Sequence, residues 1–175
     1  MRALAVLCLA LLCAAQPVRA GELQEVSCDK LHFRIVGEEF APTCRAAERA
    51  DTEVRWREEL MLAQSPTGIY VVSRAIPVSG HTHMVPIKPR RAAEATGVRA
   101  IADWGEEMRI NRYRAHAFTA QPPSGEERLQ CLAFVRNPAP TGGAHPQIFG
   151  IYCTAPEAPM DQAAAGEVLQ RIEAN

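Results

Sequence analysis

Two short segments, LQCLAFV at residues 129–135 and QIFGIYC at residues 147–153, decide the fold of this chain. Both are rich in the aromatic and aliphatic residues of buried strands, and the residues between them are rich in Pro and Gly, which favour turns. If Cys131 faces Cys153 in an antiparallel pair, the centre of symmetry falls at residue 142, inside Gly142-Gly143. The two segments are therefore predicted to form a hairpin.

The register of this hairpin also predicts which side chains share a face of the sheet. Ala133 lies opposite Ile151 and Val135 opposite Phe149. Four further side chains project to the other face, namely Leu132, Phe134, Ile148 and Tyr152. Both faces are apolar, so we expect the hairpin in the middle of the fold.

Three more strands are predicted outside this hairpin. Residues 51–63 favour a strand, with a helix as the alternative, and the turn sequence Ser65-Pro66-Thr67-Gly68 before the strand at 69–72 favours a second hairpin. Residues 108–119 alternate in polarity and predict one long strand. Residues 31–36 also alternate like a strand, although residues 23–33 suit a helix face.

Helices are predicted at residues 44–50, where Thr43 is a candidate N-cap, at residues 90–95, and after Asp161 near the C-terminus. The apolar side of the last helix consists of Ala164, Ala165, Val168, Leu169 and Ile172. The predicted fold class is therefore α+β, with an antiparallel sheet of about five strands, a C-terminal helix packed on it, and two disulfides.

The first 20 residues have the pattern of a secretory signal peptide. Met1-Arg2 is a positive start, residues 3–15 form a 13-residue apolar run, and Val18-Arg19-Ala20 precedes the expected cleavage point. A membrane anchor is the alternative, but 13 helical residues span only about 20 Å of the roughly 30 Å of hydrocarbon. We expect residues 21–175 to be a single disulfide-stapled α+β domain in the periplasm or the medium, with no membrane span.

The net charge argues against one class of function, and the choice of basic residues indicates an origin. Removing residues 1–20 leaves 17 basic and 20 acidic side chains, a net charge of −3, so a protein dominated by nucleic-acid electrostatics is not expected. The two lysines against 17 arginines in the whole chain are typical of a GC-rich genome and favour a bacterial export product.

Four cysteines remain after cleavage: Cys28, Cys44, Cys131 and Cys153. An even number in an oxidising compartment predicts disulfides, and the spacing favours Cys28–Cys44 and Cys131–Cys153 among the three possible pairings. The chain has no Cys-x-x-Cys, so metal binding or redox catalysis by these cysteines is not favoured.

The pair His81 and His83 is a candidate metal site. In an extended segment, residues two apart point the same way and can hold one copper or zinc ion together, and Met84 would suit Cu(I). The alternative is that both rings are solvated loop residues, because nothing in the sequence identifies a third ligand. No cofactor is otherwise expected.

The arginines Arg112 and Arg114 are a candidate anion-binding pair. On one strand face their guanidinium groups would grip the carboxylates or phosphates of an anionic envelope polymer. The alternative is an exposed face on which they pair with Glu106, Glu107 or Glu126.

The sequence contains no Gly-x-Ser-x-Gly or His-Glu-x-x-His motif and no phosphate-binding glycine loop. We therefore expect a non-enzymatic domain that binds an envelope protein or an anionic polymer. The two alternatives are a metal-binding protein that uses His81 and His83, and a small secreted hydrolase, for which a histidine gathered with an acidic residue in an exposed cleft would be the sign.

Overall fold

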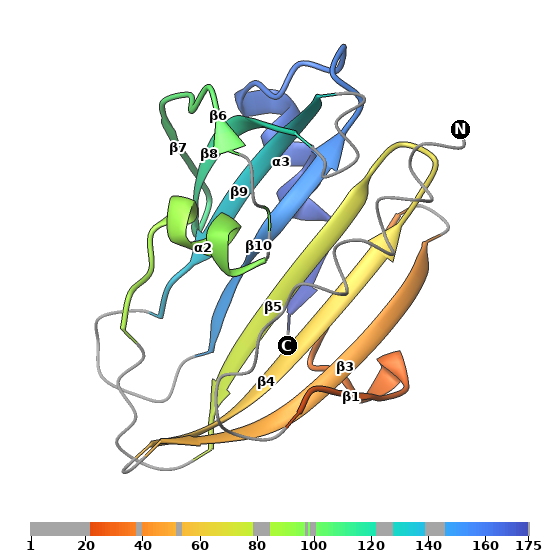
Figure 1. Cartoon of the computed structure of the whole chain (residues 1–175), viewed down its shortest axis with the longest axis vertical. Coiled ribbons are helices and arrows are strands. Elements are labelled where there is room, and N and C mark those ends of the chain that lie inside the picture. The colour runs from red at the N-terminus through yellow and green to blue at the C-terminus, as the bar shows by residue number, and fades with distance from the viewer. Residues whose placement is uncertain are drawn as a thin grey trace.

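The computed structural model describes residues 22–37, 40–51, 54–78, 85–96, 98, 101–121, 128–138 and 146–174. Most of this part of the chain is strand (Figure 1). The elements in chain order are β1 (Gln24–Glu25), η1 (Cys28–Lys30), β2 (Phe33–Ile35), β3 (Ala41–Asp51), β4 (Val54–Gln64), β5 (Ile69–Pro77), α2 (Pro89–Ala95), β6 (Ile101–Ala102), β7 (Glu107–Ile110), β8 (Tyr113–Ala120), β9 (Leu129–Arg136), β10 (Gln147–Thr154), α3 (Gln162–Gln170) and β11 (Ile172–Ala174).

One antiparallel sheet dominates the described residues. Its strands follow the order β1-β3-β4-β5-β10-β9-β8-β6, and β7 pairs with β8 as a ninth strand. A second, small sheet consists of β2 and β11. The α+β class with a C-terminal helix roughly fits, but the predicted sheet of about five strands was too small.

The hairpin of β9 and β10 lies in the interior of the sheet, as predicted. Cys153 is opposite Cys131, Ile151 opposite Ala133, and Phe149 opposite Val135. The two cysteines form a disulfide with their Cα atoms 4.1 Å apart. A strand shifted by one residue would move every side chain to the other face, so the disulfide and the apolar pattern select the same register.

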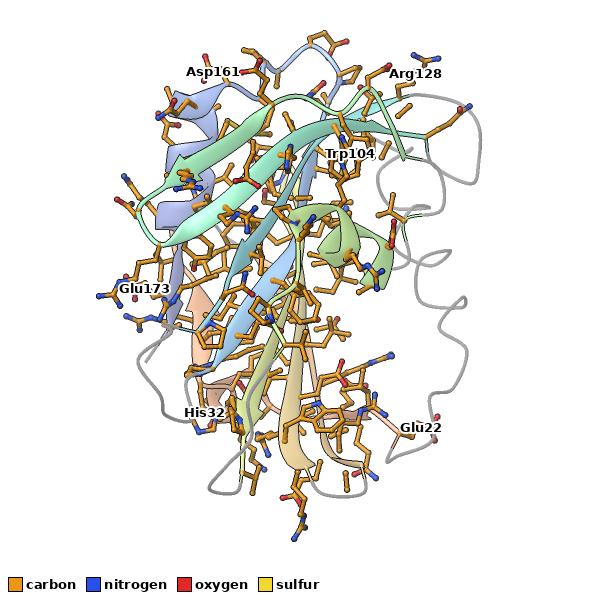
Figure 2. All side chains as sticks on the ribbon, turned by 90° about the vertical axis from the view of Figure 1, so that its left-hand side faces the viewer. Glu22, His32, Trp104, Arg128, Asp161 and Glu173 are labelled. Carbon is orange, nitrogen blue, oxygen red and sulfur yellow. A yellow bond between two sulfur atoms is a disulfide. The ribbon has the colours of Figure 1, made fainter. Side chains whose placement is uncertain are left out.

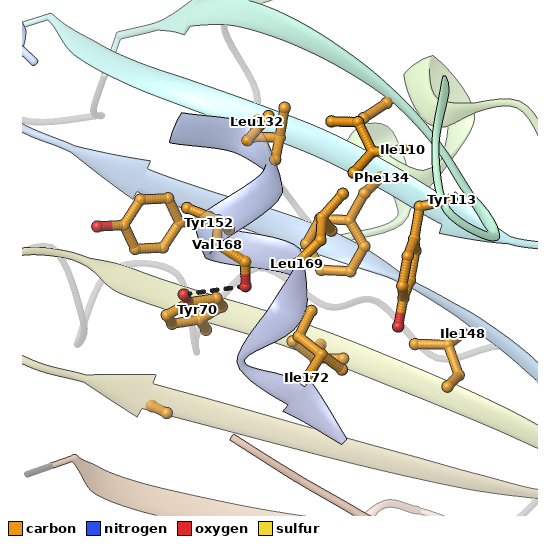
Figure 3. Close-up of a cluster of buried hydrophobic side chains, with 14 of the residues drawn as sticks. Tyr70, Ile110, Tyr113, Leu132, Phe134, Ile148, Tyr152, Val168, Leu169 and Ile172 are labelled. Carbon is orange, nitrogen blue, oxygen red and sulfur yellow. Dashed lines mark hydrogen bonds between the residues drawn. The ribbon is translucent and has the colours of Figure 1, made fainter. Parts of the chain in front are cut away.

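The larger core lies between the sheet and α3 (Figure 3). The helix begins at the predicted cap, because the Asp161 carboxylate accepts hydrogen bonds from the backbone N–H groups of Ala163 and Ala164 at 3.0 and 2.9 Å. Val168 and Leu169 of α3 then cover the predicted inner face of the hairpin. The buried side chains of the sheet on this side include Tyr70, Val72, Leu132, Phe134, Ile148 and Tyr152.

A smaller core lies on the opposite face of the sheet, under α2, which Figure 1 shows in front of the strands while α3 lies behind them. Trp104 stacks on Phe118 with ring centroids 4.7 Å apart, and the Arg90 guanidinium lies 5.0 Å from the Trp104 ring. Trp104 therefore links α2 to β8.

The predicted helix at residues 44–50 was wrong, because these residues belong to β3. The strand pairs with β4 along its whole length, from Ala41 opposite Gln64 to Asp51 opposite Val54. Cys44 is buried and forms the predicted disulfide with Cys28, which ties the N-terminal segment to the sheet. Alanine, arginine and glutamate favour helices locally, but pairing with the long β4 edge outweighs this weak preference.

The predicted single strand over residues 108–119 was also wrong, since the chain reverses within it. β7 and β8 form a hairpin in which Ile110 pairs with Tyr113 across the two-residue loop Asn111-Arg112. Asn111 adopts a φ of 54°, the left-handed conformation that asparagine tolerates better than most residues. This reversal brings Glu107 opposite His116.

Candidate functional site

A row of polar side chains crosses the core-facing side of the sheet near one end of the large core. Across neighbouring strands, Glu59 pairs with Arg74, Arg74 with Ile148, and Ile148 with Arg136. Tyr113 begins the next strand, β8. Directly opposite residues point to the same face, so Glu59, Arg74, Arg136 and Tyr113 line one side of the sheet, and we call them the polar row.

Glu59 is the negative end of the polar row and is completely buried. Its carboxylate accepts hydrogen bonds from the backbone N–H of His32 at 2.9 Å and from Nε of Arg57 at 2.9 Å, and it contacts Nδ1 of His32 at 2.6 Å. Burial raises the pKa of Glu59, but these hydrogen bonds together outweigh it and hold the pKa below its ordinary value. Glu59 is therefore ionised at neutral pH.

Arg74 is the next member of the polar row and is only 4% exposed. Its Nη1 donates a hydrogen bond to the backbone carbonyl of His32, which places the N-terminal segment over the row. Burial lowers the pKa of Arg74, the charge of Glu59 raises it, and the charge of Arg136 lowers it again. Arginine keeps its proton in proteins, so the interior holds a guanidinium charge here.

Tyr113 and Arg136 form the other end of the polar row. Tyr113 is 7% exposed, and its ring packs edge-on against Phe134 with centroids 5.9 Å apart. The hydroxyl points toward Ile148 (Figure 3) and lies against the Arg136 guanidinium, but no described residue accepts a hydrogen bond from it. Burial raises the pKa of Tyr113, while the charge of Arg136, its contact with the hydroxyl and the charge of Arg74 lower it. A buried hydroxyl whose hydrogen has no acceptor is unusual, because a buried polar group without a hydrogen bond lowers the stability of the folded state by about 1–3 kcal/mol.

We expect replacement of Tyr113 by phenylalanine to leave the free energy of unfolding unchanged or to raise it by about 1 kcal/mol, because it removes an unsatisfied buried hydroxyl. The matched control is Tyr152→Phe, at an equally buried tyrosine whose hydroxyl donates to the Thr67 carbonyl at 3.3 Å. That change should lower the free energy of unfolding by about 1 kcal/mol. Urea denaturation measures both, and a clear loss of stability in Tyr113→Phe would show that the contact of the hydroxyl with Arg136 outweighs the cost of its hydrogen without an acceptor.

The same variant has an expected signature in alkali. The pKa of Tyr113 is raised in the folded protein, so above the ordinary value of 10.0 the unfolded chain loses this proton first. The tyrosine therefore makes the folded state less stable as the pH rises from 10 toward its raised pKa. Tyr113→Phe should flatten this alkaline loss of stability, which denaturation curves at several pH values would detect.

The structure separates the two arginines that the sequence placed on one strand face. Arg112 lies in the loop between β7 and β8, and Arg114 lies in β8. Arg114 binds Glu107 with both ends of its guanidinium, at 3.0 and 2.6 Å. Arg112 is exposed and makes no ion pair with any described residue. The expected shared face was wrong, because Arg112 belongs to the two-residue loop and not to a strand.

His81 and His83 lie outside the described residues, so their metal site stays a prediction. Among the residues that the structure describes, no group of three histidine, cysteine, aspartate or glutamate side chains is arranged to hold a metal ion. The predicted cysteine pairs are both disulfides.

Two histidines lie beside acidic groups, which is one part of the feature expected of a hydrolase, the other part being an exposed cleft. His32 contacts Glu59, and Nε2 of His116 lies 3.7 Å from Glu107 while Nδ1 of His116 lies 3.0 Å from the Gly105 carbonyl oxygen. Within the described part of the chain, neither histidine hydrogen-bonds to a serine, threonine or cysteine. Figure 2 shows His32 far from Trp104, which packs on His116, so the two pairs do not form one site.

Sequence reasoning missed Arg74 and Arg136, although the signal was present. Just beyond the predicted strand at 69–72, Arg74 follows Tyr70 and Val72 at alternate positions, and Arg136 follows Phe134 in the same way just beyond the strand at 129–135. Alternate residues share a face, so both arginines occupy positions that continue a buried apolar face. A charge at such a position indicates a buried polar group that needs a partner.

No protein-family model, curated protein or solved structure matches this chain. Among the helices of the described residues, none combines the length and the apolar character needed to cross a bilayer. The polar row is therefore interpreted from its own chemistry.

Proposed function

We propose that this chain is a non-enzymatic binding domain, exported to the periplasm or the medium, whose ligand places an anionic group against Arg136 and the Tyr113 hydroxyl. The observation that carries this proposal is the buried Tyr113 hydroxyl, which lies against the Arg136 guanidinium while no described residue accepts a hydrogen bond from it. A carboxylate or phosphate oxygen would accept the hydroxyl hydrogen and bind the guanidinium at the same time.

The electrostatics of the polar row favour an anion at this end. Glu59 lies at the far end and is engaged by His32 and Arg57, whereas Arg136 has no acidic side chain within ion-pair distance among the described residues. Hydrogen bonds from a guanidinium to an anion are about twice as strong as neutral ones, and they strengthen where water is excluded. The buried guanidinium of Arg74 adds to the positive potential at the Tyr113 hydroxyl.

The fold holds these groups on rigid elements. Arg136 ends β9, the strand that the Cys131–Cys153 disulfide joins to β10, and the Tyr113 ring is fixed against Phe134. Groups held in place before binding lose little conformational entropy when the ligand arrives. The two disulfides also support export, because such bonds persist in oxidising compartments.

Titration with inorganic phosphate and with acetate, followed by calorimetry, tests the proposal. We expect saturable binding of at least one anion with a Kd on the order of 0.1–1 mM, the range that a few charge-assisted hydrogen bonds support. Arg136→Gln and Tyr113→Phe should each weaken it about tenfold, which is the loss of one hydrogen bond of about 1.4 kcal/mol.

The matched control is Arg109→Gln. This arginine is 82% exposed and lies on the face of the β7–β8 hairpin opposite to that of Tyr113. It should leave the Kd unchanged. The proposal fails if neither anion binds saturably, or if Arg109→Gln weakens binding as much as Arg136→Gln does.

A further inference from the structure

Building on the proposed function, we infer that the ligand carries two neighbouring anionic groups, the second of which binds the guanidinium of Arg112. The ligand class is then a compound with linked anionic groups, such as a condensed phosphate, in place of one with a single isolated charge. Arg112 determines this specificity, whereas Arg136 and Tyr113 hold the first group.

The hairpin of β7 and β8 places Arg112 beside the first site. Arg112 directly precedes Tyr113 in the chain, and the loop Asn111-Arg112 closes the hairpin at the end of β8 where Tyr113 begins. Arg114 pairs with Val135, so this end of β8 adjoins the end of β9 that carries Arg136. Neighbouring strands are about 4.8 Å apart, which puts the backbones at all three residues within a few ångströms of one another.

Local carboxylates do not neutralise Arg112. The acidic residue of β7 is Glu107, and both of its oxygens are bound by Arg114 at 3.0 and 2.6 Å. Glu107 also has the more distant Arg109 at 3.9 Å. Arg112 is exposed at the tip and forms no ion pair with a described residue, so it is available to an incoming anion.

An exposed arginine alone binds anions weakly, because water and salt screen its charge. A ligand already held at Arg136 and Tyr113 changes this, since its second charge is then presented to Arg112 at a high effective concentration. The expected result is a clear preference for linked anions over single ones at the same ionic strength.

Calorimetric titration with tripolyphosphate and with orthophosphate, both at 150 mM salt, tests the inference. Tripolyphosphate should bind at least about tenfold more tightly than orthophosphate. Arg112→Gln should remove this gain while it leaves the orthophosphate Kd within about twofold of the original value. Arg109→Gln, the matched change on the same hairpin, should keep the gain.

The outcomes separate this inference from the proposed function. If orthophosphate binds and depends on Arg136, but tripolyphosphate shows no gain, the second site is wrong and the first remains. A gain that Arg109→Gln removes as fully as Arg112→Gln also overturns the second site, because it reports only the general charge of the hairpin. Absence of binding by both anions overturns the proposed function itself.

Discussion

Replacing Glu59 with glutamine is expected to lower the free energy of unfolding by about 3 kcal/mol, because removing one partner of a buried charge cluster leaves the others uncompensated. The Glu59 carboxylate is fully buried and binds the backbone and ring of His32 and the side chain of Arg57. The amide keeps the shape but loses the charge that faces Arg74 across the strands.

The neighbouring residue provides the control for this prediction. Glu58 points to the opposite face and forms a partly exposed ion pair with Arg49 at 2.7 Å. Because partly exposed pairs contribute little, Glu58→Gln should cost less than about 1 kcal/mol in urea denaturation. Equal losses in the two variants would contradict the role assigned to the buried carboxylate.

A second change identifies the cause of the Glu59 effect. In the double variant Glu59→Gln with Arg74→Leu, the buried guanidinium that faced the carboxylate is also removed. We expect the double variant to recover about half of the loss, because an apolar replacement of a buried charge cluster is often tolerated. A fully additive loss would show that the two side chains do not interact.

The acid stability should change in a defined direction. The pKa of Glu59 is lowered in the folded protein, so its contribution to stability is present above the ordinary value of 4.5 and is lost as the pH falls through the lowered pKa. The unmodified protein should therefore lose more stability than Glu59→Gln between about pH 5 and pH 2.

Replacing Gly150 with alanine is expected to cost about 3 kcal/mol or more, because the added methyl group meets backbone that has no room to move. A Cβ atom at Gly150 would lie 2.2 Å from the carbonyl oxygen of Val71 and 3.0 Å from the Phe134 ring. Gly150 belongs to β10, which lies between β9 and β5, so relief would require displacement of a neighbouring strand.

Gly166→Ala is the control, because no atom lies within 4 Å of the added Cβ and the residue is inside α3. Alanine there should raise the free energy of unfolding by about 0.5–1 kcal/mol through its better helix propensity. The midpoints of urea denaturation compare the two variants directly. A loss below about 1 kcal/mol at Gly150 would show that the central strands adapt more readily than their packing indicates.

The central hairpin was predictable because several local signals agree on one register. Two cysteines, a turn segment midway between them, and two apolar faces each require Cys131 opposite Cys153. The C-terminal helix was predictable for a similar reason, since Asp161 caps it and its apolar side faces the core. These elements could be predicted from the sequence because their independent local preferences agree.

β3 and the β7–β8 hairpin were not predictable in this way. The residues from Cys44 to Ala50 favour a helix in isolation, and only the partner strand β4 makes them a strand. The turn at Asn111 interrupts an alternating pattern that looks continuous in the sequence. In both places, a contact with a distant or reversed strand outweighs the local preference.

The amino-acid sequence by itself determined the disulfide partners, the register of the central hairpin and the capped helix, because these depend on residue types and spacings along the chain. The tertiary structure alone decided the polar row. The polar row takes one residue from each of four strands, namely Glu59, Arg74, Arg136 and Tyr113. Only the strand order β4-β5-β10-β9-β8 places these four residues side by side on one face of the sheet. The physical reason is that strand order is set by the burial of both faces of the sheet, a property of the whole chain that no local pattern contains.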